Sequence, residues 1–139
     1  MNDDQVFTVE DLWDGPREGF ASFRGRPHHF RCIFDEAADD WTDRFHLTPV
    51  SDEALAAARE AWEIWLRWEE ALVAGETTEE THPALPAERP RYEHLKGIYD
   101  GAVDRNQSAA FMARGEFRSS DGATTDDAML RVRWRITAA

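Results

Sequence analysis

The stretch SDEALAAAREAWEIWLRWEEALVAG, residues 51–75, decides the expected fold, because it predicts one long helix. Ser51 is a favourable N-cap, since its hydroxyl can accept a hydrogen bond from a free backbone N–H of the first turn. Asp52 and Glu53 follow where the helix dipole favours negative charge. Gly75 comes after the last periodic residue and tolerates the left-handed conformation that ends many helices. Both ends of the helix are therefore marked.

The helix is apolar over about half of its circumference. At about 100° per residue, one line of side chains runs along it, formed by Leu55, Trp62, Leu66 and Val73. Trp65 and several alanines widen that line, and charged residues occupy a narrow remaining strip. We therefore expect cover on two sides of the helix, either from a sheet and a second element or from a partner chain. The same surface fits a homodimer as well as a covered monomer.

Glu69 is the one carboxylate inside this apolar arc. One interpretation is that it reaches solvent near the helix end or pairs with an arginine. The functional interpretation is a carboxylate of raised pKa in an aromatic pocket, suited to acid/base chemistry or to binding a cation. A third is that the helical register is misassigned at this position.

The rest of the chain predicts strands on either side of the helix. We expect β-hairpins over residues 6–48, a helix over 51–74, a linker and short helix over 76–102, and a hairpin over 108–137. The predicted fold class is α+β in a single domain of residues 1–139, with a mostly antiparallel sheet of about five strands packed on one long central helix and a second short helix. A small barrel made by the N-terminal hairpins is an alternative.

Alternating residues predict which strand faces are buried. His28, Phe30, Cys32 and Phe34 share one face, whose phenylalanines place it toward the core. In the last hairpin an apolar face is expected to pack on the central helix. Its opposite face is basic and carries Arg114, Arg118, Arg131, Arg133 and Arg135, with Glu116 as the only acid. These arginines either pair with the surplus acids of the chain or bind a phosphate, a carboxylate or an acidic protein.

Charge and composition exclude several classes of protein. The formal net charge of −12 opposes general nucleic-acid binding and anionic membranes. The acidic N-terminus has no signal-peptide pattern, so we expect a cytoplasmic protein. Cys32 is the only cysteine, which rules out an internal disulfide. The acid-rich residues 35–43 predict a solvated turn, with a weak calcium site as the minor alternative. We expect neither a metal nor a cofactor.

No catalytic motif is present: the P-loop, dinucleotide-binding, zinc-finger, HExxH and GxSxG patterns are all missing from the sequence. The favoured function is a protein- or ligand-binding module of accessory, regulatory or immunity type. Its ligand is a protein partner or a small anion, and its candidate binding residues are Trp62, Trp65, Arg17, Arg131, Arg133 and Arg135. A small enzyme is the first alternative, with candidate catalytic residues Glu69, His28, His46 and His94. The second alternative is an acidic mimic of nucleic acid.

Overall fold

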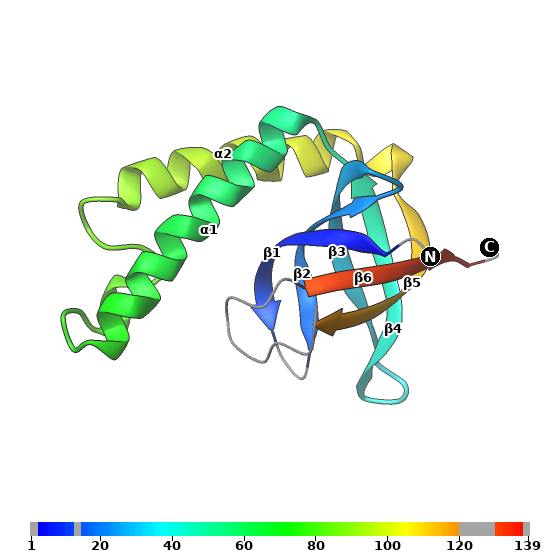
Figure 1. Ribbon diagram of the computed structural model, residues 1–139, viewed down its shortest axis with the longest axis horizontal. Coiled ribbons are helices and arrows are strands. Elements are labelled where there is room, and N and C mark those ends of the chain that lie inside the picture. Colours follow the sequence, from blue (N-terminus) through cyan, green and yellow to red (C-terminus); the bar gives the residue numbers. More distant parts are fainter. Residues whose placement is uncertain (1–2, 13–14, 120–129, 138–139) are drawn as a thin grey trace.

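Six antiparallel strands form a closed barrel in the computed structural model, which describes residues 3–12, 15–119 and 130–137 (Figure 1). The strands follow one another around the barrel in chain order. They are β1 (Asp4–Leu12), β2 (Pro16–Phe23), β3 (Arg26–Asp35), β4 (Asp40–Pro49), β5 (Phe111–Ser119) and β6 (Leu130–Ile136). The pairing of β1 with β6, at Asp4↔Val132 and Gln5↔Arg131, closes the ring.

The predicted fold class is wrong in its central point. Instead of about five strands packed on one long helix, the strands close on themselves and make their own core. The apolar face of the β5–β6 hairpin was expected against the helix, but it lines the barrel interior. The predicted alternation holds at most positions of β3, β5 and β6. Alternation is the same in an open sheet and in a barrel, however, so it does not reveal closure.

Aromatic side chains fill the barrel. Phe30, Phe45 and Trp134 pack edge-on or tilted against one another, with ring centroids 5.5–6.1 Å apart. Phe30 and Cys32 face inward as predicted, and so does His28. Phe34 departs from the pattern and is 40% exposed, because the β3–β4 register shifts between Cys32 and Phe34. The packed interior is therefore a core.

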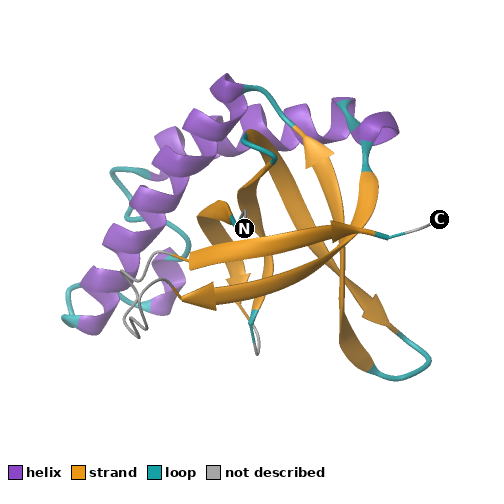
Figure 2. Cartoon of the chain, turned by 45° about the vertical axis from the view of Figure 1, so that its right-hand side comes forward, coloured by secondary structure: helices purple, strands orange, loops and turns teal. Residues whose placement is uncertain are grey.

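A helical hairpin lies on the outside of the barrel (Figure 2). It consists of α1 (Asp52–Val73) and α2 (Arg89–Arg105), joined through the short 3₁₀ helix η1 (Glu79–Thr81), and a second 3₁₀ helix, η2 (Gln107–Ala109), leads into β5. The predicted ends of α1 are confirmed: Ser51 Oγ accepts from Ala54 N at 3.1 Å, and Gly75 has a φ of 78°. The second helix is longer than expected. Among the described residues, no helix combines the length and apolarity needed to cross a membrane.

The two faces of α1 explain its wide apolar arc. One side packs on α2, through residues such as Ala58 and Leu95, and another contacts β1 and β3 on the outer surface of the barrel. Two buried clusters result, one inside the barrel and one between the barrel and the hairpin. The cover on two sides that the sequence predicts is thus supplied within one chain.

Candidate functional site

A small cavity opens where α1 and α2 meet the outer face of β1. It has a volume of about 40 Å³ and is lined by one carboxylate, one alanine and four aromatic residues: Glu10, Ala61, Trp62, Trp65, Tyr92 and Tyr99. We call this site the Glu10 cleft. Three separate elements contribute to it, so it exists only because the hairpin is docked on the barrel.

Irregular pairing of β1 positions Glu10. The β1–β2 register shifts between Val6 and Thr8 and again between Val9 and Asp11, and such bulges turn side chains away from strict alternation. Thr8 is fully buried, and its Oγ1 accepts from Phe20 N at 3.1 Å. The same hydroxyl lies 3.5 Å from Glu10 Oε2. The bulged strand therefore presents Glu10 to the helices.

Gly19 makes the close approach of β1 and β2 possible. A Cβ atom at this position would lie 2.1 Å from the carbonyl oxygen of Thr8 and 3.0 Å from the Phe30 ring. Both neighbours are fixed, since one is backbone and the other a core side chain. Only glycine fits here, and the geometry that places Glu10 depends on it.

The aromatic walls come from the two helices and are held in place. Trp62 and Trp65 project from α1, and Trp65 Nε1 lies 3.4 Å from His82 Nε2. Tyr99 packs edge-on against Phe20, with ring centroids 5.4 Å apart, and its hydroxyl hydrogen-bonds with that of Tyr92. Burial raises the pKa of both tyrosines, so their rings stay neutral across the physiological range.

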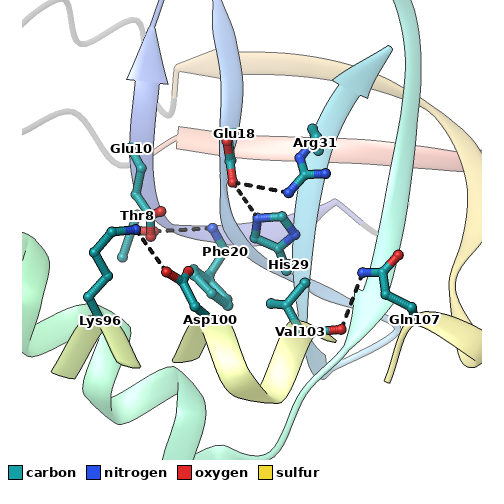
Figure 3. Close-up of polar contacts among 10 residues, drawn as sticks. All are labelled: Thr8, Glu10, Glu18, Phe20, His29, Arg31, Lys96, Asp100, Val103 and Gln107. Carbon is teal, nitrogen blue, oxygen red and sulfur yellow. Dashed lines mark hydrogen bonds and ion pairs between the residues drawn. The ribbon is translucent and has the colours of Figure 1, made fainter. Parts of the chain in front are cut away.

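Two ion-paired groups surround Glu10, as Figure 3 shows. On the barrel, Glu18 Oε2 lies 2.8 Å from His29 Nε2 and 3.8 Å from an Arg31 nitrogen. The hydrogen bond from the His29 ring lowers the pKa of Glu18, and the charges of His29, Arg31 and Lys96 lower it further. On α2, Lys96 Nζ lies 2.9 Å from Asp100 Oδ2 and 5.7 Å from the centre of the Tyr99 ring.

Glu10 itself forms no ion pair with any residue that the structure describes. Removal of surrounding water by the protein raises its pKa from 4.5 to about 8, and the carboxylates of Glu18 and Asp100 add to the rise. Lys96 and the Thr8 hydroxyl oppose it. Glu10 nevertheless keeps an exposed surface at the mouth of the cleft, so water screens part of this effect. The direction is clear: this carboxyl holds its proton more tightly than an ordinary glutamate.

Two of the predicted binding residues, Trp62 and Trp65, line the cleft. The predicted carboxylate, Glu69, does not; it is half-buried further along α1. Nor does the structure bring Glu69 together with the candidate histidines. His28 lies inside the barrel, where its Nδ1 is 2.9 Å from the Arg26 carbonyl and burial lowers its pKa, and His46 is exposed on β4.

The predicted arginines fall into separate environments. The Arg17 guanidinium stacks over the Trp41 ring at 5.0 Å and donates to Cys32 Sγ at 3.5 Å. Arg131 donates to the Asp3 carbonyl, and Arg133 pairs with the Asp3 carboxylate at 3.2 Å. Arg135 is exposed on β6. His94, the remaining candidate, is exposed on α2.

Sequence reasoning missed Glu10 as a site residue. Nothing in the sequence placed a strand carboxylate beside the aromatic residues of the two helices. An acidic residue in a strand with weak alternation was the only available signal. Within the described part of the chain, no three His, Cys, Asp or Glu side chains are arranged to hold a metal ion.

Neither a protein-family model, nor a curated protein, nor a solved structure matches this chain.

Proposed function

We propose that the protein is a binding module that holds the ammonium group of an organic cation in the Glu10 cleft. One observation carries the proposal: a carboxylate without an ion-pair partner among the described residues closes a cavity whose other walls are mainly aromatic faces and edges. Aromatic rings attract cations, and a nearby carboxylate supplies the opposite charge. Both features act on the same class of ligand.

The resident ion pair on α2 supports this choice of ligand. Lys96 already places its ammonium group over the Tyr99 ring, so the site stabilises a cation of this type within the protein itself. Asp100 pairs with Lys96, and Glu18 pairs with His29 and Arg31, which leaves Glu10 for an external charge. The net charge of −12 also favours the approach of a cation.

The dimensions of the cleft restrict the bound group. A volume of about 40 Å³ admits two or three water-sized atoms, which matches a primary or monomethylated ammonium head. The remainder of the ligand would extend from the open mouth. A quaternary ammonium is too large, so the proposed class is primary and secondary alkylamines, including polyamines.

The test is a titration with n-butylammonium followed by NMR through the tryptophan indole N–H signals. We expect saturable shifts for Trp62 and Trp65 with a Kd on the order of 1 mM, which corresponds to about −4 kcal/mol. Butanol and butyrate have similar size without the positive charge, and neither should bind. Affinity should rise from pH 6 to pH 8.5, because deprotonated Glu10 is the form that attracts the ligand.

Glu10→Gln and Glu69→Gln are matched variants, since each replaces one carboxylate by an amide of the same size, inside the cleft lining for Glu10 and outside it for Glu69. We expect Glu10→Gln to weaken butylammonium at least tenfold and Glu69→Gln to leave the Kd within twofold. Binding that depends on Glu69, or butanol binding as tightly as butylammonium, would contradict the proposal.

A further inference from the structure

Three arginines lie side by side on the outer face of the barrel, one on each of three neighbouring strands. Arg114 on β5 lies opposite Arg44 on β4 and, on its other side, opposite Arg135 on β6. Adjacent strands are about 4.8 Å apart, so the three Cα atoms span roughly 10 Å. Directly opposite residues in a sheet point to the same side, which brings the three guanidinium groups onto one face. We call these residues the arginine row.

No carboxylate of the described part of the chain pairs with the arginine row. Like charges directly opposite one another destabilise a strand pair, so the row carries an energetic cost. Other arginines of the same face are neutralised. Asp3 pairs with both Arg118 and Arg133, and Glu116 accepts from Arg118 at 3.0 Å. The Asp3 end of this face is therefore balanced in charge, and the row is not.

Asp4 borders a groove together with Arg135, but the two side chains belong to opposite sides of the sheet. Asp4 is in register with Val132, whose fully buried side chain points into the barrel, whereas Arg135 alternates to the outside. The Asp4 carboxylate accepts hydrogen bonds from Ser22 Oγ at 2.9 Å and from Gly25 N at 3.3 Å. These bonds hold the turn between β2 and β3 and leave the charge of the row in place.

The backbone beneath the row belongs to the core of the barrel. Phe45 and Ala113, the residues next to Arg44 and Arg114, pair directly with each other, and neither is more than 2% exposed. Arg44 N also donates to Thr42 Oγ1 at 3.1 Å. The positions of the guanidinium-bearing residues are thus fixed before a ligand arrives, and binding has to order only their side chains.

We propose that the arginine row binds a compact polyphosphate anion, either free triphosphate or the triphosphate group of a nucleotide. Each guanidinium offers five N–H donors in a planar fork that matches the oxygens of a phosphate. A phosphate group carries about −1.5 to −2 charges near pH 7 and presents three acceptor oxygens. Consecutive phosphates concentrate several such charges within the width of the row, so one ligand can neutralise all three arginines.

The exposure of the row requires a ligand that contacts several arginines at once. Arg114 and Arg135 are exposed, and a single ion pair at a protein surface contributes at most about 1 kcal/mol. A carboxylate of a partner would neutralise only one arginine of the row. A long nucleic acid would place few of its phosphates on a row roughly 10 Å wide, and the net charge of −12 repels the others. A compact polyphosphate avoids both disadvantages.

The experiment is a calorimetric titration with inorganic triphosphate at low salt and pH 7. We expect one site with a Kd on the order of 0.1 mM, weakened at least tenfold at physiological salt. Citrate, a compact anion with three carboxylates, should bind at least tenfold more weakly. Adenosine triphosphate distinguishes the two sources of the ligand. Equal affinity assigns the row to polyphosphate in general, and tighter binding assigns it to a nucleotide.

Variants of the row test which residues bind the anion. Arg114→Gln removes the central charge and should weaken triphosphate at least tenfold, and Arg44→Gln and Arg135→Gln should each weaken it at least threefold. Arg114→Lys keeps the charge without the fork, so its affinity should fall between those of wild type and Arg114→Gln. Arg105→Gln changes an exposed arginine on α2 and serves as the matched control, with a Kd within twofold of wild type. Circular dichroism checks that each variant is folded.

The proposal fails if Arg114→Gln binds triphosphate as wild type does, or if citrate binds equally well. It also fails if a single-stranded oligonucleotide binds more tightly than triphosphate. Shifts of the Trp62 and Trp65 indole signals by triphosphate would place the anion in the Glu10 cleft and would refute it too. The row lies on β4, β5 and β6, whereas Glu10 lies on β1, so this inference does not depend on binding of alkylammonium.

Discussion

Replacing Glu10 by glutamine should stabilise the protein at alkaline pH while removing its proposed ligand. In the folded chain the pKa of Glu10 is raised to about 8, whereas an unfolded glutamate has a value near 4.5. Between these two values the folded state binds a proton that the unfolded state releases. Folding stability from this group is therefore highest below pH 4.5 and falls as the pH rises toward 8.

The size of the effect follows from the shift and from the exposure of the side chain. A difference of 3.5 pH units (8 − 4.5) would correspond to about 5 kcal/mol at 1.36 kcal/mol per unit. Glu10 is exposed at the cleft mouth, and water screening reduces the effect substantially. We expect about 1 to 2 kcal/mol. At pH 8.5 Glu10→Gln should be more stable than wild type by that amount, because glutamine carries no charge.

Urea denaturation followed by tryptophan fluorescence at pH 5, 6.5 and 8.5 measures this difference directly. At pH 5 the difference should be no more than about 0.8 kcal/mol, since folded Glu10 is still protonated there and the unfolded glutamate has only begun to lose its proton. The Thr8 contact, at 3.5 Å, is too long to contribute much. Glu69→Gln should show no comparable gain at pH 8.5. A Glu10→Gln variant that is less stable than wild type at pH 8.5, or a difference that does not change with pH, would refute the reasoning.

Three further predictions concern the elements around the two sites. Gly19→Ala should lower the free energy of unfolding by about 2 to 4 kcal/mol in urea titrations, because the added Cβ would lie 2.1 Å from the Thr8 carbonyl oxygen. Gly97→Ala should instead raise the free energy of unfolding by about 0.5 to 1 kcal/mol, because Gly97 lies in α2 and an added Cβ there has no other atom within 4 Å. Glu18→Ala should lower stability at pH 7 by about 1 to 2 kcal/mol, since buried His29 loses its partner. As the folded pKa of Glu18 is lowered, its contribution is present above pH 4.5 and is lost as the pH falls further, so the wild-type advantage should shrink in denaturation at pH 3. Arg114→Thr should raise the thermal midpoint by a few degrees at low salt, because it removes the repulsion of Arg114 by Arg44 and Arg135, which lie directly opposite it. A lower midpoint would show that the three charges do not repel one another.

Local patterns in the sequence were sufficient to find the helices and most strand faces. Ser51 and Gly75 mark the ends of α1 because capping depends on neighbours a few residues away. Alternation at Phe30 and Cys32 gave the inward face of β3 for the same reason. Closure of the barrel was not predictable in this way, since it depends on the pairing of Gln5 with Arg131, which are remote in sequence.

The candidate site likewise combines features that local sequence patterns predict with features that depend on long-range contacts. Trp62 and Trp65 were predicted as binding residues because both lie on the apolar arc of one predicted helix. The role of Glu10 could not be predicted in this way, because it depends on the bulged strand β1 passing beneath both helices. Glu69 was predicted as a site residue because it interrupts the apolar arc of α1. That arc is divided between α2 and the barrel, and a charged side chain can lie where the two contact surfaces meet.

The insertion of the helical hairpin between β4 and β5 has a consequence for hydrogen exchange. Those strands pair directly, at Phe45↔Ala113 and Leu47↔Phe111, so the ring of interstrand hydrogen bonds is complete without the helices. The hairpin can therefore open as a cooperative unit while the barrel amides stay protected. A ligand in the Glu10 cleft bridges the two units. The bound ligand should slow hydrogen exchange at amides of α1 and α2 and leave the slowest barrel amides unchanged. Binding would therefore stabilise the docked hairpin without changing the stability of the barrel.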